Sequence, residues 1–350
     1  MAIQVSSAAP VTLPAPTSSG SSSVSPPESM TLSKATPIDR PVSAYVGLPP
    51  WTEKNEKALL APYTYIVSIP GKDLRTQLLR AFNSWYNLPD HTFNVISEVV
   101  GMLHNASLLF DDIEDYTELR RGQPVAHRVF GLPQTINTAA YAMFVAMSKL
   151  YTIPNLQPST HQTLMDIFLE EIIELHRGQG LEIYWRETGT CPSEEEYFCM
   201  IKQKTGGLFR LGVRLMAACS PDVNVDSTSV VDLFSVFFQV RDDVMNLDSG
   251  DYAAAKGFAE DLTEGKFSFP VVHAISVSPA GDSYVLDTLQ THPTDLDVKI
   301  ALVEHLRHKT KSLEYARALL RDLERKLAGE VGRLGGNKGL EGIMKKLGEY

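Results

Sequence analysis

The chain has 350 residues, which is long enough to bury a sizeable core as one large domain or two small ones. Its formal net charge of −10 argues against a nucleic-acid surface, because phosphate binding needs a basic footprint. The three cysteines, Cys191, Cys199 and Cys219, form no CxxC pair, so the sequence predicts neither a disulfide framework nor a structural zinc site and favours a reducing compartment. The longest apolar runs are shorter than the ~20 residues that span a bilayer, so no membrane span is expected.

The first part of the chain differs in composition from the rest. Residues 1–29 are rich in Ser and Pro, so this segment has too few apolar side chains to pack into a core. It contains no Lys or Arg, so it lacks the positive charge of a mitochondrial transit peptide. We expect a disordered N-terminal arm over residues 1–45 and a single folded domain over residues 46–350.

From Trp51 onward the pattern is helical, because apolar residues recur at spacings of three and four and few segments alternate with period two. Ser193 and Glu196 form a predicted capping box before an apolar run. Residues 296–327 read as one long amphipathic stretch that ends around Gly335 and Gly336. The sequence therefore predicts an all-α domain of ten or more helices.

The first acidic motif is "FDDIED", which falls on a helix expected from about residue 92 to residue 116. Asp111 and Asp115 share one face a turn apart, and His104 and Ser107 lie on the same stripe. Two carboxylates at this spacing destabilise a helix unless a cation binds between them. The alternative for an isolated motif of this kind is a solvated acidic patch, and a calcium loop is excluded because the required glycine is absent.

A second acidic motif indicates that the cation bound by the first motif is a metal ion. Gln239, Asp242, Asp243 and Asn246 form a polar stripe at spacings of three and four within a segment rich in Phe and Val. Carboxylates on two helices that face each other across a bundle predict an open magnesium site, in which substrate phosphates complete the coordination. A diphosphate is the ligand that such a site favours.

Cationic side chains recur near both motifs. Any one of them would ordinarily be a solvated surface group, but together they are enough to bind two separate diphosphates. These residues are Lys72, Arg75, Arg120, Arg121, Lys204 with its neighbour Thr205, Lys256 and Lys266.

Four segments in this order resemble the trans-isoprenyl diphosphate synthases, and most closely the geranylgeranyl diphosphate synthases of the fungal and animal type. They are "LLFDDIEDYTELRRGQPVAH", "HRGQGLEIYWR", "KTGGLFRL" and "FQVRDDVMNL" with "FAEDLTEGKFSFPVVHAI" after it, and the resemblance runs from about Pro70 to Ala274. It implies a single-domain antiparallel helical bundle with a central cavity, the isoprenoid synthase fold that class I terpene synthases share.

The resemblance also implies a role for each matching residue. Magnesium, as three ions with bound diphosphate, would be held by Asp111, Asp115 and Asp242. Isopentenyl diphosphate would be bound by Lys72, Arg75, His104 and Arg121. The allylic diphosphate would be bound by Arg120, Lys204, Thr205, Gln239, Lys256 and Lys266, with Asn246 as the third polar position of the second motif. Lys204, Thr205 and Gln239 would also act in catalysis, by stabilising the leaving group and the carbocation.

Product length follows from the residues below the first motif. Ala106 and Ser107 are small where short-chain members of the family carry bulky aromatic residues, so a twenty-carbon product is expected. Met143, Phe144 and His176 are candidates for a deeper floor, although each reads equally well as a core side chain. Glu182 departs from the Asp that many relatives carry.

Several alternatives remain open at this stage. The chain could make farnesyl or longer prenyl diphosphates, could be a class I terpene cyclase, or could be a non-catalytic synthase subunit. A cyclase is disfavoured because the positions for its Ser/Thr and Glu ligands hold Asn246 and Gly250, and a silent subunit because both acidic motifs are intact. The resemblance implies a homodimer or higher homo-oligomer, and a cytoplasmic location is the default.

Overall fold

The computed structural model describes residues 46–48, 50–71, 74–248 and 258–348, and the chain divides into two units, residues 1–50 and 51–350. The expected arm over residues 1–45 lies outside the described residues, as do two of the expected cations, Lys72 and Lys256. All the helices and strands that the structure describes belong to the second unit.

The described residues form fifteen α-helices, one short 3-10 helix and one two-stranded ladder, which confirms the all-α prediction. The helices are α1 (Glu53–Leu59), α2 (Ala61–Ser68), α3 (Leu74–Tyr86), α4 (Asp90–Glu114), α5 (Ala126–Phe130), α6 (Leu132–Lys149), α7 (Pro158–Thr188), α8 (Glu194–Ala218), α9 (Thr228–Asp248), α11 (Glu260–Thr263), α12 (Phe269–Val277), α13 (Tyr284–Gln290), α14 (Leu296–His308), α15 (Ser312–Arg333) and α16 (Lys338–Leu347). The 3-10 helix η2 is Leu150–Thr152, and the strands are β1 (Leu119–Arg120) and β2 (Gln123–Pro124).

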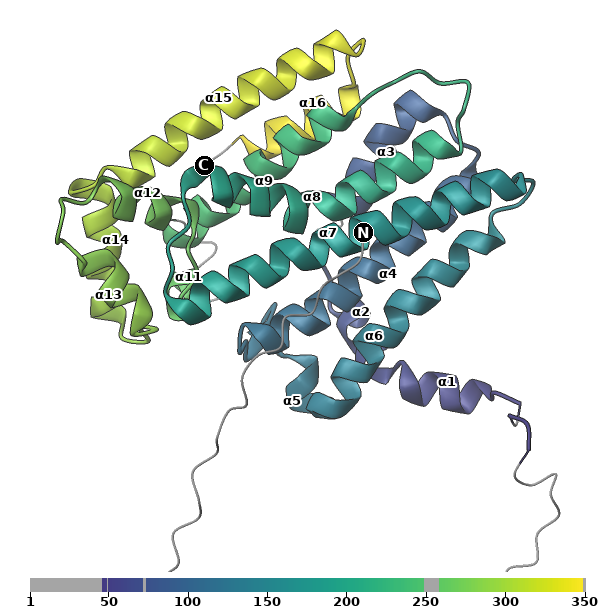
Figure 1. Cartoon of the computed structure of the whole chain (residues 1–350), viewed down its shortest axis with the longest axis horizontal. Helices are drawn as coiled ribbons and strands as arrows, with labels where there is room; N and C mark the ends of the chain where they lie inside the picture. The colour runs from purple at the N-terminus through teal and green to yellow at the C-terminus, as the bar shows by residue number, and fades with distance from the viewer. Residues whose placement is uncertain (1–45, 49, 72–73, 249–257, 349–350) are drawn as a thin grey trace, which may run out of the picture. The chain divides into compact units, whose positions relative to one another are not determined.

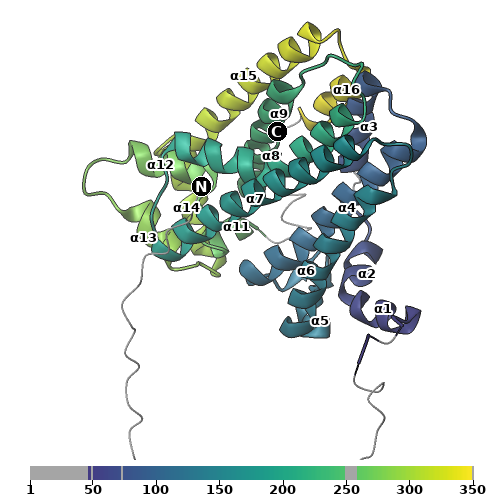
Figure 2. The same cartoon turned by 45° about the vertical axis from the view of Figure 1, so that its right-hand side comes forward.

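The long helices form the body of the bundle. Helix α8 packs against both α7 and α9, and α4 packs against α6 and α8 (Figure 1). Helices α11 to α14 gather at one end of the bundle in both views (Figure 2). One core cluster joins α3, α4 and α8, and a second joins α9, α12, α14 and α15.

Helix α4 carries the first acidic motif at its C-terminal end. It covers Asp90–Glu114 rather than residues 92–116, because Tyr116 adopts a left-handed φ of 54° that ends the helix. Its apolar face, including Ile96, Val99 and Leu103, is fully buried. The motif is therefore fixed at the end of a helix that packs deep in the fold.

Helix α4 is also the one helix in the described part of the chain that is long and apolar enough to cross a membrane, by length and composition alone. The short apolar runs of the sequence predict no such segment. Of its most apolar window, 44% is buried inside the protein, and the helix packs against α2, α3, α5, α6 and α8. These are the contacts of a core helix.

Two local predictions have different outcomes. The capping box of Ser193 and Glu196 is present at the start of α8. The single stretch expected over residues 296–327 is instead two helices, α14 and α15, because Lys311 adopts a left-handed φ of 57° between them.

Candidate active site

The arginines of "LRRG" are placed by a tight hairpin between β1 and β2. Arg121 and Gly122 have φ values of 54° and 76°, as the two-residue turns that join antiparallel strands require. Arg120, the last residue of β1, reaches α4 and donates from Nε to both carboxylate oxygens of Asp112, at 2.8 and 3.0 Å. Its NH2 group lies 3.2 Å from Asp111 Oδ2. The hairpin therefore fixes one guanidinium directly against the first motif.

The three aspartates of the first motif have different environments. The Asp112 side chain is buried, and burial raises the pKa of its carboxyl, while Arg120 partly offsets this effect. Asp115 caps the helix, and Arg186 of α7 donates to its Oδ1 at 2.6 Å and to the carbonyl of Glu114 at 2.7 Å. Burial and then the charge of Asp111 raise the pKa of Asp115 to about 7. Asp112 thus orients Arg120, whereas Asp111 and Asp115 form a carboxylate pair that the existing cations do not fully neutralise.

Lys204 lies between the first motif and α7. Its Nζ donates to Glu182 and lies 3.7 Å from Asp111 Oδ1. Burial would lower the pKa of Lys204, but the charges of Glu182, Asp111 and Asp115 outweigh it and raise the pKa. Burial would likewise raise the pKa of Glu182, yet Lys204 and Lys266 leave it lowered. Both groups are therefore charged at neutral pH, and the lysine is held in a fixed position.

A close crossing of α7 and α8 makes this arrangement possible. A Cβ added at Gly178 of α7 would lie 2.5 Å from the backbone nitrogen of Lys204 and 2.9 Å from the Met200 carbonyl. Any side chain at residue 178 would push the two helices apart. The glycine of "HRGQG" therefore has a packing role, which the sequence motif alone does not show.

The second motif is arranged around Asp243 of α9. This carboxylate is fully buried and accepts from Gln239 Nε2 at 2.9 Å and from the backbone N–H of Phe269 at 2.7 Å, and Lys266 Nζ lies 3.4 Å away. Gln239 Oε1 in turn accepts from Thr205 Oγ1 at 2.9 Å. The structure thus brings Thr205, Gln239 and Lys266 together around one buried carboxylate.

The remaining polar positions of α9 have separate roles. Asn246 is buried, and its Oδ1 accepts from the backbone N–H of Asp261 at 3.2 Å, which ties α9 to the first turn of α11. Asp242 is half-buried on the same helix. Burial would lower the pKa of Lys266, but Asp261 and Asp243 raise it well above its ordinary value.

A cluster of cations with little compensating charge forms a second anion-binding candidate. Burial and the charges of Arg121 and Arg120 lower the pKa of Arg75 to about 10. Burial and the charges of Arg75, Arg120 and Arg121 hold the pKa of His104 well below its ordinary value, so the imidazole is neutral. Arg121 donates to the Ile69 carbonyl at 2.7 Å, and its guanidinium lies 2.8 Å from where a Cβ at Gly71 would be, so a side chain at residue 71 would displace this guanidinium. Cations that repel each other in this way are stabilised by a bound anion.

The two acidic motifs influence each other electrostatically. Burial raises the pKa of Glu264 well above its ordinary value, and Asp261 and the first-motif aspartates Asp115 and Asp111 add to this effect. Lys266 also acts on Glu182 and on Lys204. The end of α4 and the loop that follows α11 therefore face a common region.

The donor chemistry of this region fits a divalent metal ion. Asp111 and Asp115 supply hard oxygen ligands, and burial together with the charge of Asp111 raises the pKa of Asp115, an effect that a bound cation would offset. Within residues 46–348, leaving out the undescribed gaps, no group of three or more His, Cys, Asp and Glu side chains could hold a metal ion unaided. The carboxylates would need oxygen atoms from a ligand to complete the coordination.

The residues expected to set product length lie in two kinds of environment. Ala106 is fully buried, and Ser107 is half-buried with its Oγ donating to the His104 carbonyl at 2.8 Å. Met143 is half-buried against the first core cluster. Phe144 is 66% exposed and His176 is also exposed, so within this single chain they do not close the bottom of a cavity.

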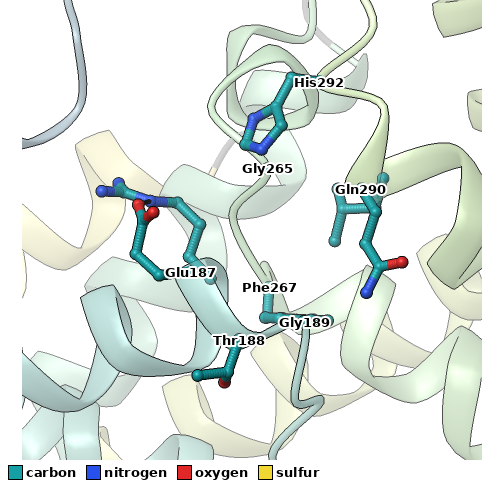
Figure 3. Close-up of a pocket in the computed structure, with 9 residues that line it drawn as sticks. Glu187, Thr188, Gly189, Gly265, Phe267, Gln290 and His292 are labelled. Atoms are coloured by element: carbon teal, nitrogen blue, oxygen red, sulfur yellow. Dashed lines mark hydrogen bonds and ion pairs between the residues drawn. The ribbon is translucent and has the colours of Figure 1, made fainter. Parts of the chain in front are cut away.

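A cavity of about 240 Å³ lies at the C-terminal end of α7, close to the first acidic motif. Figure 3 shows Glu187 and Thr188 on one side of it and Gln290 and His292 on the other. Arg186 also lines it, and the same side chain donates to Asp115.

Two residues that matter in this geometry have no individual role in the sequence-based prediction. Arg186 belongs to the segment "HRGQGLEIYWR", but the sequence pattern assigns no function to it. For Asp243 the pattern indicates only that it is one member of a polar stripe. The sequence does contain an indication that Asp243 is buried, because it is followed by Val244 and lies on the apolar side of α9. No local signal pairs Arg186 with Asp115, since the two are 71 residues apart.

Comparison with known proteins places these features in a family. The polyprenyl synthetase family matches residues 56–306 of the chain. The chain is 49% identical over 292 residues to a geranylgeranyl pyrophosphate synthase of Mucor circinelloides f. lusitanicus, covering 83% of this chain and 93% of that one. It is 44% identical over 310 residues to a geranylgeranyl pyrophosphate synthase of Hericium erinaceus, covering 83% and 91%. A third such enzyme, from Fusarium fujikuroi, is 46% identical over 303 residues, covering 85% and 70%.

Proposed function

Because the chain belongs to the polyprenyl synthetase family, whose members are prenyltransferases, we propose that it is a geranylgeranyl diphosphate synthase. It condenses isopentenyl diphosphate head to tail with dimethylallyl, geranyl or farnesyl diphosphate, and it releases pyrophosphate. The observation that carries this proposal is the presence of two cation clusters near the aspartate motifs. Arg75 and Arg121 lie close enough to act on each other and on His104, whereas Lys204 lies 3.7 Å from Asp111 of the first motif and Lys266 lies 3.4 Å from Asp243 of the second.

Each cluster suits one diphosphate. Arg75 and Arg121 repel each other and so favour an anion that brings no metal, which is the role of isopentenyl diphosphate. The neutral His104 beside them can donate one hydrogen bond to a phosphate oxygen. Lys204 lies next to Asp111, so a diphosphate there contacts both the lysine and the metal-binding carboxylates. This is the site for the allylic substrate.

Prenyl synthases of this family use a divalent metal ion, and we propose that it is magnesium, as three ions held by Asp111, Asp115 and Asp242 together with the diphosphate. When bound, the ions supply charge neutralisation at the departing pyrophosphate. Lys204 and Lys266 contribute to the same neutralisation from the protein side.

The protein's own oxygens act on the carbocation. When the allylic C–O bond ionises, positive charge develops on the hydrocarbon, and the oxygens of Gln239 and Thr205 stabilise it. The double bond of isopentenyl diphosphate then attacks this carbon and forms the new C–C bond. A proton is lost from the adduct to the released pyrophosphate, which completes one five-carbon extension.

The twenty-carbon product is supported by the names of the relatives and by the small side chains below the motif. Ala106 is fully buried on α4, so a prenyl tail that passes it meets no bulky aromatic side chain there. Farnesyl or longer prenyl diphosphates are the alternative products. A cyclase has no use for the metal-independent cluster of Arg75 and Arg121, and that cluster disfavours it.

We further propose that the chain forms a homodimer through α6 and α7. Helix α7 has apolar residues on both faces, since Leu164 and Phe168 are buried while Leu169 and Ile173 are 59% and 41% exposed. Phe144 of α6 is 66% exposed. A second copy of the chain would cover the exposed apolar side chains of α6 and α7 with an equally apolar surface. It would also cover Phe144, which a single chain leaves open.

The domain limits and the location of the protein are part of the same proposal. Residues 46–350 act as one catalytic domain. The three cysteines are unpaired, as a reducing compartment such as the cytosol would leave them.

The test is incubation of purified protein with labelled isopentenyl diphosphate, magnesium and farnesyl diphosphate, followed by analysis of product length after dephosphorylation. We expect a twenty-carbon alcohol that disappears in Asp111→Asn. Asp90→Asn, at the opposite end of the same helix, is the matched control and should retain activity. A fifteen-carbon or much longer product would refute the assigned length, and no incorporation of label would refute the synthase proposal.

A further inference from the structure

Tyr197 is a buried polar residue that the proposed mechanism does not use. It lies one turn into α8, is fully buried, and packs against Phe198 and Phe269 at ring-centroid distances of 5.8 and 5.5 Å. Its hydroxyl donates to Asp243 Oδ2. A phenol in such a place needs one hydrogen-bond partner, and this partner is the carboxylate at the centre of the second motif.

Asp243 is not positioned as a metal ligand in this arrangement. Its Oδ2 accepts from Tyr197 and from the backbone N–H of Phe269, and its Oδ1 accepts from Gln239 Nε2 with Lys266 nearby. The donors at Oδ2 come from α8 and from the first residue of α12. They clamp the carboxylate, so that Oδ1 has one fixed direction.

The fixed carboxylate determines which way the Gln239 amide points. An ionised carboxylate can only accept hydrogen bonds, so the amide NH2 group must face Asp243 and the amide oxygen must point away from it. That oxygen accepts from Thr205 Oγ1 at 2.9 Å. The hydrogen bonds therefore run in one direction, from Thr205 to Gln239 to Asp243, with Tyr197 donating from the other side.

The orientation matters for the reaction. An amide oxygen carries partial negative charge and stabilises a neighbouring carbocation, whereas a flipped amide would present its positive NH2 group and destabilise it. We propose that Tyr197 is a positioning residue for prenyl transfer. It holds Asp243 so that the Gln239 amide presents its oxygen, and not its nitrogen, to the allylic cation. This inference rests on the proposed function.

Loss of the Tyr197 hydroxyl should affect the reaction mainly by changing the orientation of Gln239, and less by moving Lys266. The Gln239–Asp243 hydrogen bond is 2.9 Å long, whereas Lys266 lies 3.4 Å from Asp243 and is also held by Asp261 at 3.6 Å. Lys266 would contact the diphosphate, so its displacement would weaken substrate binding. Gln239 would act on the cation, so its misorientation would slow the chemical step and leave binding intact.

The test is Tyr197→Phe, which removes one oxygen atom and keeps the ring. Tyr86→Phe is the matched control, because Tyr86 is equally buried and its hydroxyl bonds to Ser227 and the Val225 carbonyl in the first core cluster. Both variants should lose a similar amount of thermal stability. Only Tyr197→Phe should lower kcat, by tenfold or more, with KM for farnesyl diphosphate changed less than threefold.

A double-mutant cycle tests whether Tyr197 acts on the reaction by way of Gln239. In a Gln239→Leu background, Tyr197→Phe should have little further effect on kcat, because the group that it positions is gone. Equal kcat losses in Tyr197→Phe and Tyr86→Phe, a loss confined to KM, or full additivity with Gln239→Leu would each overturn the inference. Incorporation of isopentenyl diphosphate by the wild-type protein is measured alongside, so a failure of the proposed function is seen separately.

Discussion

At the scale of single residues, the aspartates of the first motif divide their work in a way that their spacing does not show. The helical register correctly predicts that Asp111 and Asp115 share one face. It does not predict that Asp112 turns inward to bind Arg120, because that contact depends on a hairpin turn after the helix. The sequence thus identifies Asp111 and Asp115 as metal-binding candidates, whereas the role of Asp112, which binds Arg120, depends on tertiary packing.

The raised pKa of Asp115 leads to a prediction about stability. Since its pKa is about 7 in the fold against 3.8 ordinarily, the folded protein without metal should lose stability as pH rises from about 4 to 7, and should not recover it above 7. Asp115→Asn removes the charge. In EDTA at pH 8, we expect its Tm to exceed that of the wild type by about 2–4 °C, while activity is lost.

Asp90→Asn is the control for this comparison, since Asp90 is exposed at the start of the same helix. The difference between wild type and Asp115→Asn should shrink as pH falls towards 4. A Tm for Asp115→Asn below that of the wild type at pH 8 would show that its bond with Arg186 outweighs the burial of its charge.

At the scale of elements, the site depends on how closely helices approach. Periodicity predicts that helices exist, and the Ser193 capping box marks the start of α8 correctly. Periodicity cannot predict that α7 and α8 cross tightly at Gly178, because that contact joins residues from two helices through the backbone. For the same reason it did not show the break at Lys311, where one residue in a left-handed conformation separates two helices with similar patterns.

Gly178→Ala tests this contact. The added methyl group would lie 2.5 Å from the backbone nitrogen of Lys204, so the helices must separate. We expect a loss of about 1–3 kcal/mol in the free energy of unfolding and a clear fall in activity, measured by urea denaturation and the condensation assay.

Gly329→Ala in α15 is the matched control, because a Cβ there meets no atom within 4 Å. This change should leave activity intact and raise stability slightly, as alanine favours a helix more than glycine does. If Gly178→Ala behaves like Gly329→Ala, the close crossing is not required.

At the scale of the whole molecule, composition and pattern predicted the all-α class, and the described residues confirm it. The same reasoning could not predict where Phe144 would lie, because an apolar residue on a helix can face a core or a partner with the same spacing. The exposed apolar residues of α6 and α7 are explained if a second copy covers them.

The dimer proposal predicts a molecular mass of two chains in solution, measured by light scattering on a size-exclusion column. Ile173→Lys on α7 should shift the protein towards monomer, because it buries a charge in an apolar interface. Leu296→Lys on α14, where the residue is 56% exposed, is the control and should leave the mass unchanged. A wild-type mass of one chain at micromolar concentration would contradict the proposal.

Two separate diphosphate pockets beside the aspartate motifs predict that the KM values of the two substrates change separately when the cation of one pocket is removed. Arg75→Gln should raise KM for isopentenyl diphosphate at least tenfold while KM for farnesyl diphosphate changes less than threefold. Lys204→Gln should do the reverse, because Lys204 lies beside Asp111. If each variant raises both KM values together, the two clusters serve a single pocket and the account is wrong.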